Sequence, residues 1–166
     1  MPGFSSEKQS NADYDVVIVG GGLAGLYSIY RLRKLGLTIR AYEAGDGVGG
    51  TWFWNRYPGC RCDVESMEYS YSFDDELQQE WIWPERYGTQ PVILEYINHV
   101  AKRFDLMRDV QLNTRITDAI FCEEQHLWTI TTSSGEKVTA PICIMATGNL
   151  STPRKPDFRG LDDFKG

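Results

Sequence analysis

A glycine-rich turn at residues 20–25 carries the pattern with the clearest chemistry in this sequence. Its residues, Gly20-Gly21-Gly22-Leu23-Ala24-Gly25, follow the spacing G-x-G-x-x-G. Between a strand and a helix, the first glycine permits a tight bend, and the second lets the backbone approach a pyrophosphate. The third allows the helix to pack closely on the strand, and the helix N-terminus offers N–H groups and partial positive charge to the phosphates. We therefore predict that Gly20, Gly22 and Gly25 bind a nucleotide cofactor.

Glu43 is the acidic residue expected to complete this site. It directly follows an apolar run at residues 38–42. A carboxylate in that position can accept hydrogen bonds from ribose hydroxyls, each contributing about 1.5–3 kcal/mol. The same carboxylate would repel a 2′-phosphate, which favours FAD or NAD over NADP at this site. The alternative is a glycine turn with an unrelated surface glutamate, and the position of Glu43 after a strand disfavours it.

The elements that must position these residues form a strand–helix–strand unit. Residues 15–19 are a β-branched run typical of a strand buried on both faces, as in a parallel sheet. Residues 23–35 place apolar side chains at helical spacing, and Gly36 is a good helix stop. Residues 38–42 form a second strand. The whole pattern fits within about thirty residues, which is the size of a βαβ unit.

The segment at residues 44–88 is rich in glycine and aromatic residues and shows no regular periodicity. A long irregular segment inside a domain is usually functional or wrongly assigned. Within it, residues 49–59 place a glycine pair beside aromatic and polar side chains. A flat isoalloxazine ring needs apolar walls and a few fixed polar groups, so this stretch favours flavin over nicotinamide. The alternative is that Trp52, Trp54 and Tyr57 only fill a core.

The second half of the chain predicts one helix followed by short strands. Thr89-Gln90-Pro91 marks the helix start, with Thr89 or Gln90 as the cap and proline in the first turn. The residues expected on its buried face are Leu94, Ile97, Ala101 and Phe104. Short strands are expected at residues 110–114, 119–122 and 127–132, with turns at 123–126 and 133–136, and a last buried strand at 142–146.

These elements predict an α/β fold: a Rossmann-like FAD-binding domain with a parallel sheet and an additional small antiparallel β-meander. We expect a loose tail at residues 1–12, the N-terminal portion of the FAD-binding domain at residues 13–150, and a linker at residues 151–166.

Composition narrows the possible partners and locations. With 42% hydrophobic residues and a net charge of -6, the chain is globular and gains nothing from counterion release on nucleic acid. Its four cysteines and two histidines are too dispersed for a zinc site, so no metal is expected. It shows neither a basic and apolar leader nor an apolar stretch long enough to span a membrane. We therefore expect a cytoplasmic protein with no nucleic-acid or membrane partner.

Longer motifs resemble those of the Baeyer–Villiger monooxygenases, which are class B flavoprotein monooxygenases. The resemblance spans residues 14–166 and is strongest to the branch of phenylacetone and steroid monooxygenases. Its most specific motif is Gly50-Thr51-Trp52-Phe53-Trp54-Asn55-Arg56-Tyr57-Pro58-Gly59. The other motifs are the glycine turn extended to Tyr27, Arg61-Cys62-Asp63-Val64-Glu65-Ser66, Tyr69-Ser70-Tyr71-Ser72-Phe73 and Ala146-Thr147-Gly148.

The resemblance implies an enzyme that binds FAD, reduces it with NADPH and uses O2 to convert ketones into esters or lactones. It places Ala24 and Glu43 on the adenosine side of FAD and Ile116 near the adenine, although relatives often have serine in place of Ala24. The residues it places along the flavin are Gly50, Thr51, Trp52, Phe53 and Trp54.

The resemblance also implies roles for residues 61–69. Asp63 and Tyr69 would lie near the flavin ring, and Arg61, Cys62 and Asp63 would face NADPH. Asp63 would also pair with a catalytic arginine, because a carboxylate stabilises such a cation and fixes its direction. Two alternatives stay open: Asp63 could instead cap a turn, and Arg61 could form a structural ion pair. Cys60 replaces the alanine usual in relatives and is interpreted as a packing residue.

Motifs of the remaining parts of such an enzyme are missing from these residues. The sequence has no second G-x-G-x-x-G, and the family motif F-x-G-x-x-x-H-x-x-x-W is represented only by Phe164-Lys165-Gly166. We therefore expect the remainder of the same enzyme, including the NADPH-binding domain and the catalytic arginine, to be the partner of this chain. Residues 1–166 alone should not oxygenate ketones. The alternatives are a class B enzyme that oxygenates nitrogen or sulfur, and a non-catalytic nucleotide-binding module.

Overall fold

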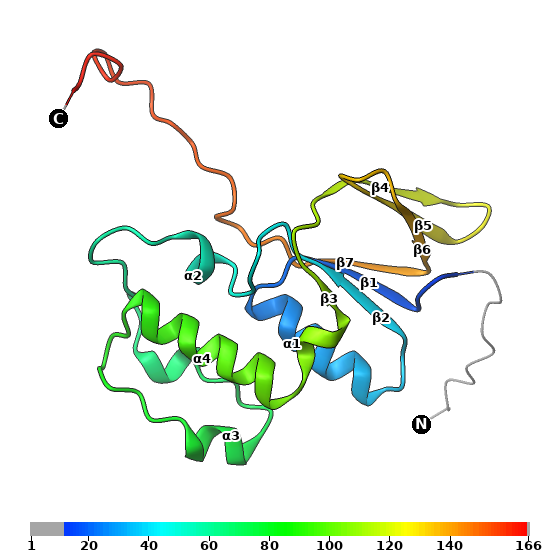
Figure 1. Cartoon of the computed structure of the whole chain (residues 1–166), viewed down its shortest axis with the longest axis horizontal. Helices are drawn as coiled ribbons and strands as arrows, with labels where there is room; N and C mark the ends of the chain where they lie inside the picture. The colour runs from blue at the N-terminus through cyan, green and yellow to red at the C-terminus, as the bar shows by residue number, and fades with distance from the viewer. Residues whose placement is uncertain (1–11, 166) are drawn as a thin grey trace.

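The computed structural model describes residues 12–165, which form two β-sheets and a layer of helices (Figure 1). The predicted tail, apart from Ala12, lies outside the described residues. The larger sheet is parallel, with the order β3-β2-β1-β7. Its strands are β1 (Val16–Val19), β2 (Ile39–Tyr42), β3 (Val110–Gln111) and β7 (Ile142–Met145). The smaller sheet is antiparallel and consists of β4 (Ile116–Cys122), β5 (Leu127–Thr132) and β6 (Lys137–Ala140). The predicted fold class is confirmed.

Strand β1 lies at the centre of the molecule because both of its faces are covered. Val16 and Ile18 point into a core shared with the helices, whereas Val17 points into a second core shared with the antiparallel sheet. All three side chains are fully buried. Successive side chains of a strand alternate between faces, so a strand packed on both sides must be apolar throughout. This explains the β-branched run that identified it.

Helix α1 (Leu23–Lys34) packs on β1 through Leu26, Ile29 and Tyr30, which are buried. Its last turn is basic, which complements the negative end of the helix dipole. Gly36, with φ at +77°, then ends the helix as predicted. Arg33 fixes the end of α1 by donating to the backbone oxygen of Phe104 at 2.9 Å and to the carboxylate of Asp109.

Four shorter helices and one long helix complete this layer. The irregular region holds α2 (Thr51–Trp54), the 3-10 turn η1 (Ser66–Tyr69) and α3 (Asp75–Glu80). They are followed by α4 (Gln90–Arg103) and the 3-10 turn η2 (Leu106–Asp109). Helix α4 begins where Thr89-Gln90-Pro91 predicted. Its buried apolar residues are Ile93, Tyr96, Ile97, Val100 and Ala101, whereas Leu94 and Phe104 are only partly buried, so the predicted face was rotated by part of a turn.

The strands after α4 differ from the prediction in three places. The strand expected at residues 110–114 ends at Gln111 and lies in the parallel sheet beside β2. It ends there because Asn113, at φ +53°, and Thr114 turn to donate to the backbone oxygens of Gly45 and Glu43, both at 2.8 Å. Strand β4 begins at Ile116 rather than at residue 119. The third strand of the meander, β6, was not predicted, because only half of its four residues are apolar.

Tyr42, at the end of β2, makes the stability of the fold depend on pH in the alkaline range. It is 2% exposed and packs between the two sheets. Burial, with the nearby charge of Glu136, raises the pKa of Tyr42 from 10.0 to about 12. The folded state therefore holds this proton more tightly than the unfolded chain, so its contribution to stability is complete below pH 10.0 and is lost as the pH approaches 12.

We expect Tyr42→Phe to weaken this dependence of stability on alkaline pH, measured by urea unfolding below and above pH 10.0. Tyr27→Phe, which removes the hydroxyl of an exposed tyrosine on α1, should retain the wild-type slope. Equal slopes for the wild type and Tyr42→Phe would contradict the assignment.

Candidate nucleotide-binding site

The glycine turn leaves β1 and enters α1 in the geometry that its spacing predicted. Gly20 has φ at +110° and donates its N–H to the backbone oxygen of Tyr42 at 2.8 Å. A Cβ at Gly20 would overlap the carbonyl of Ala146, and one at Gly25 would overlap the carbonyl oxygen of Gly20. Both positions therefore require glycine. The turn is closed on one side by the end of β7, where Ala146 lies.

The N-terminus of α1 is left open to an anion. Gly22 is its N-cap and makes no side-chain capping bond, and the first turn of the helix contains no acidic residue. The first N–H groups of a helix have no partner within the helix. Ala24 in this turn is exposed. The first turn of α1 therefore presents backbone N–H donors beside Gly22 and the exposed Ala24.

Glu43 joins the end of β2 to the glycine turn. Its side chain is buried, with 5% exposed, and its two carboxylate oxygens accept the N–H groups of Gly21 at 2.7 Å and Gly45 at 2.8 Å. Each carboxylate oxygen has a second lone pair. Glu43 thus fixes the turn and also keeps a negative acceptor beside the N-terminus of α1.

The aromatic segment packs directly against the same turn. Gly49 donates its N–H to the backbone oxygen of Gly21 at 3.0 Å, and the Cα of Gly50 lies in close contact with Gly22. Helix α2 begins immediately afterwards. The backbone of Gly49-Gly50 thus packs against that of Gly21-Gly22. This contact places the aromatic residues of α2 next to the glycine turn.

The four residues of α2 have different surroundings. Trp52 is 6% exposed and meets Tyr69 edge to face at 5.3 Å between ring centroids, so it belongs to the core. Phe53 covers Gly45 and Gly47. Thr51 and Trp54 are exposed, Trp54 to 57%. Filling of the core therefore accounts for Trp52, but not for Trp54.

Residues 61–69 lie beside α2. Arg61 forms a β-bridge with Thr89, and its guanidinium group lies 3.3 Å from the carboxylate of Glu85. Cys62 is buried, and Asp63 is exposed and forms no ion pair within residues 12–165. Burial raises the pKa of the Tyr69 hydroxyl, and the charges of Cys62 and Asp63 act in the same direction. Tyr69 therefore remains a hydrogen-bond donor at neutral pH.

Ile116 begins β4 and is half-buried against the second core. The preceding residues are bonded to the backbone of Glu43 and Gly45, as described above, so Ile116 lies near the end of β2. No pattern within the sequence pointed to Ile116; only the resemblance suggested it.

Gln90 is a polar residue of this region that sequence reasoning did not identify as functional. It is buried, with 8% exposed; its side-chain Nε2 donates to the backbone oxygen of Trp52 at 2.5 Å, and its backbone N–H donates to that of Cys60 at 2.8 Å. A glutamine beside a proline at a helix start is too common a pattern to reveal these contacts.

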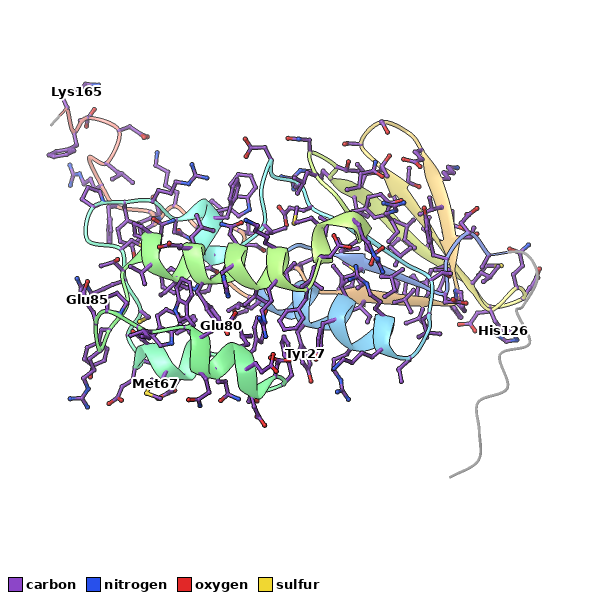
Figure 2. All side chains as sticks on the ribbon, turned by 60° about the horizontal axis from the view of Figure 1, so that its bottom comes forward. Tyr27, Met67, Glu80, Glu85, His126 and Lys165 are labelled. Atoms are coloured by element: carbon purple, nitrogen blue, oxygen red, sulfur yellow. The ribbon has the colours of Figure 1, made fainter. Side chains whose placement is uncertain are left out.

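Other kinds of site were sought within residues 12–165. No group of three or more His, Cys, Asp or Glu residues there is arranged to hold a metal ion. His126, in the turn between β4 and β5, lies at the opposite end of the molecule from Glu85 (Figure 2). In the same range, no helix is both long and apolar enough to span a membrane.

Comparison with known proteins agrees with this geometry. Residues 18–78 match the family model of an NAD(P)-binding Rossmann-like domain. A Baeyer–Villiger monooxygenase of Pseudooceanicola batsensis is 48% identical over 96% of this chain and 29% of its own length. A phenazine N-monooxygenase of Lysobacter antibioticus is 47% identical over 92% of this chain and 28% of its own length.

Two solved structures have the same fold. Oxidised steroid monooxygenase bound to NADP has a TM-score of 0.85 and 58% identity, over 90% of this chain and 29% of the other. A complex of OTEMO with FAD and NADP has a TM-score of 0.86 and 42% identity, over 94% of this chain and 30% of the other.

The chain thus spans less than a third of the length of the relatives it matches. The resemblance predicted from the motifs is confirmed. Over nearly its whole length, this chain is homologous to a portion of the Baeyer–Villiger monooxygenases.

Proposed function

We propose that the site binds the ADP moiety of FAD. The observation that carries this proposal is the pairing of an open helix N-terminus with a buried carboxylate bonded to the same turn. A diphosphate could approach the backbone N–H groups of this turn closely, because its glycines carry no side chain and the first turn of α1 contains no acidic residue. In this proposal the N–H groups of residues 22–25 hold the phosphates, and the free lone pairs of Glu43 accept the ribose hydroxyls. Ile116 lies along the adenine.

The flavin would extend from the turn toward α2. Gly50 packs directly against Gly22, and Thr51, Phe53 and Trp54 would offer one hydroxyl and two aromatic surfaces. Trp52 would hold these residues in place from the core, where its ring contacts that of Tyr69. The residues proposed to face NADPH are Arg61, Cys62 and Asp63. Reduced by NADPH, bound FAD would supply the electrons with which O2 is activated.

The whole protein is proposed to be an FAD- and NADPH-dependent monooxygenase that converts ketones into esters or lactones. Support comes from the sequence similarity to a Baeyer–Villiger monooxygenase. The remainder of the same protein would supply the NADPH-binding domain and a catalytic arginine. Asp63 is exposed and free of other ion pairs within the described residues, so it is available to hold that arginine. The four free cysteines fit a reducing location such as the cytoplasm.

A second candidate is oxygenation of nitrogen rather than of a ketone. The phenazine N-monooxygenase is almost as similar to this chain as the Baeyer–Villiger relative. A substrate panel of ketones and aromatic amines, offered to the whole enzyme, separates the two activities. A non-catalytic nucleotide-binding module would instead bind FAD without consuming NADPH.

We expect the purified protein to bind FAD and to take on the flavin absorption band after gel filtration. ADP should compete with FAD, and 2′-phospho-ADP should compete far less, because Glu43 repels the extra phosphate. Isothermal titration calorimetry measures both. A protein that shows no flavin absorption band after incubation with excess FAD and gel filtration would rule out the proposed function.

A further inference from the structure

We propose that Gln90 is a positioning residue that holds two cofactor-facing segments in register. These are residues 50–54, proposed to lie along the flavin, and residues 60–63, proposed to face NADPH. The inference rests on the proposed function for the identity of the cofactors. It rests on the structure alone for the coupling of the two segments.

The contacts of Gln90 reach both segments from one point. The side-chain amide bonds to the carbonyl of Trp52, and the main-chain N–H bonds to the carbonyl of Cys60. Two neighbouring bonds extend the second link: Cys62 donates to the backbone oxygen of Gly88 at 3.0 Å, and Arg61 pairs with Thr89. Residues 60–62 are therefore bound along the chain that leads into α4. Among the hydrogen bonds of residues 12–165, the one from the Gln90 side chain continues this connection to α2.

The carbonyl of Trp52 needs this donor because α2 is a single turn. The carbonyls on either side have local partners, since Thr51 accepts the N–H of Asn55 at 3.0 Å and Phe53 accepts Nε of Arg56 at 2.7 Å. Within the described residues, the carbonyl of Trp52 accepts one hydrogen bond, and its donor is the side chain of Gln90. A buried carbonyl without a donor is strongly unfavourable, so loss of the amide should displace the turn that carries Trp52.

Helix α4 holds Gln90 in a fixed position. The 14-residue helix is anchored in the core by Ile93 and Ile97, both fully buried. Thr89 and Pro91 flank Gln90 in the backbone, where the proline fixes its own φ angle. The Gln90 amide thus extends from the rigid helix α4 to α2, a single helical turn that is too short to be stable by itself. Displacement of α2 would move Thr51 and Trp54 relative to residues 61–63.

The test compares Gln90→Met, which preserves the shape of the side chain without its donor, with Gln90→Glu, which places a carboxylate against the carbonyl. Gln79→Met serves as control, because Gln79 is exposed on α3. The full-length protein is used. One readout needs no cofactor: hydrogen exchange of the amides in residues 50–56 and 60–62, with α1 as the internal reference. The other readouts are FAD affinity and the visible circular dichroism of bound FAD.

We expect Gln90→Met to accelerate exchange in residues 50–56 by about tenfold or more, with α1 unchanged, and Gln90→Glu to accelerate it further. FAD affinity should fall by about tenfold, and the flavin dichroism should change shape. A purely structural role would lower the melting temperature and leave the flavin spectrum and local exchange unchanged at temperatures well below melting. Wild-type exchange at residues 50–56 in Gln90→Met would overturn the inference. A wild type that fails to bind FAD, with exchange altered as described, would overturn the proposed function and keep the coupling.

Discussion

Replacing Gly25 by alanine is expected to destabilise the domain by more than about 3 kcal/mol, beyond the usual effect of one added methyl group in a core. The new Cβ would overlap the carbonyl oxygen of Gly20. That carbonyl cannot shift freely, because Gly20 itself lies against the backbone of Ala146 and is bonded to Tyr42. Alanine is the better helix former by about 1 kcal/mol, so any loss must come from the overlap. Urea unfolding followed by circular dichroism measures it.

Ser28→Ala is the matched control, since it also introduces alanine into α1. It removes only a bond from the Ser28 hydroxyl to the carbonyl of Ala24 and should change stability by less than about 0.5 kcal/mol. FAD titration of the same samples should show binding by Ser28→Ala and none by Gly25→Ala. A Gly25→Ala protein as stable as the wild type would show that the helix does not approach the turn as closely as described.

Replacing Glu43 by glutamine should lower both stability and FAD affinity. Glutamine has nearly the same shape, but one of its terminal groups is an NH2 that cannot accept a hydrogen bond. Either Gly21 or Gly45 would then lose the acceptor for its buried N–H, which costs about 1–3 kcal/mol. Loss of the charged acceptor should weaken FAD by a further factor of about ten to a hundred.

Thermal unfolding with and without FAD separates the two effects of Glu43→Gln. Glu123→Gln, at an exposed turn of the small sheet, should match the wild type in both. The discrimination between ADP and 2′-phospho-ADP should also shrink in Glu43→Gln, because the repulsive charge is gone. If Glu43→Gln kept wild-type affinity and discrimination, the carboxylate would have no part in sugar recognition.

The sequence predicts the elements of residues 15–43 well because their signals are local, whereas α2, η1 and α3 were not predicted. The strand at β1, the glycine turn and α1 follow one another directly, and each has its own periodicity or stop residue. Glu43 was found for the same reason. Strand β3 was too short to be assigned correctly, because its two residues are specified by a partner, β2, that lies far away in the chain. Strand β6 lacked the apolar content by which a strand is recognised.

Within the candidate site, backbone contacts are what the sequence could not reveal. Trp52 and Trp54 look alike in the sequence, yet one is buried against Tyr69 and the other is exposed. Their difference depends on which way a four-residue helix is turned, and Gln90 holds that helix through a carbonyl group. Main-chain oxygens exist at every residue, so no residue type signals the contact.

The wall formed by the backbone of Ala146 against Gly20 has a consequence for how the protein folds during translation. Among the strands of residues 12–165, β7, which ends at this wall, is synthesised after all the others, although it pairs with β1, which is synthesised before them. Contacts between such distant parts of a chain form slowly, because the long intervening segment must first be ordered. The glycine turn would therefore lack its contact with Ala146 until translation has passed β7, and binding of the proposed cofactor would be delayed until then.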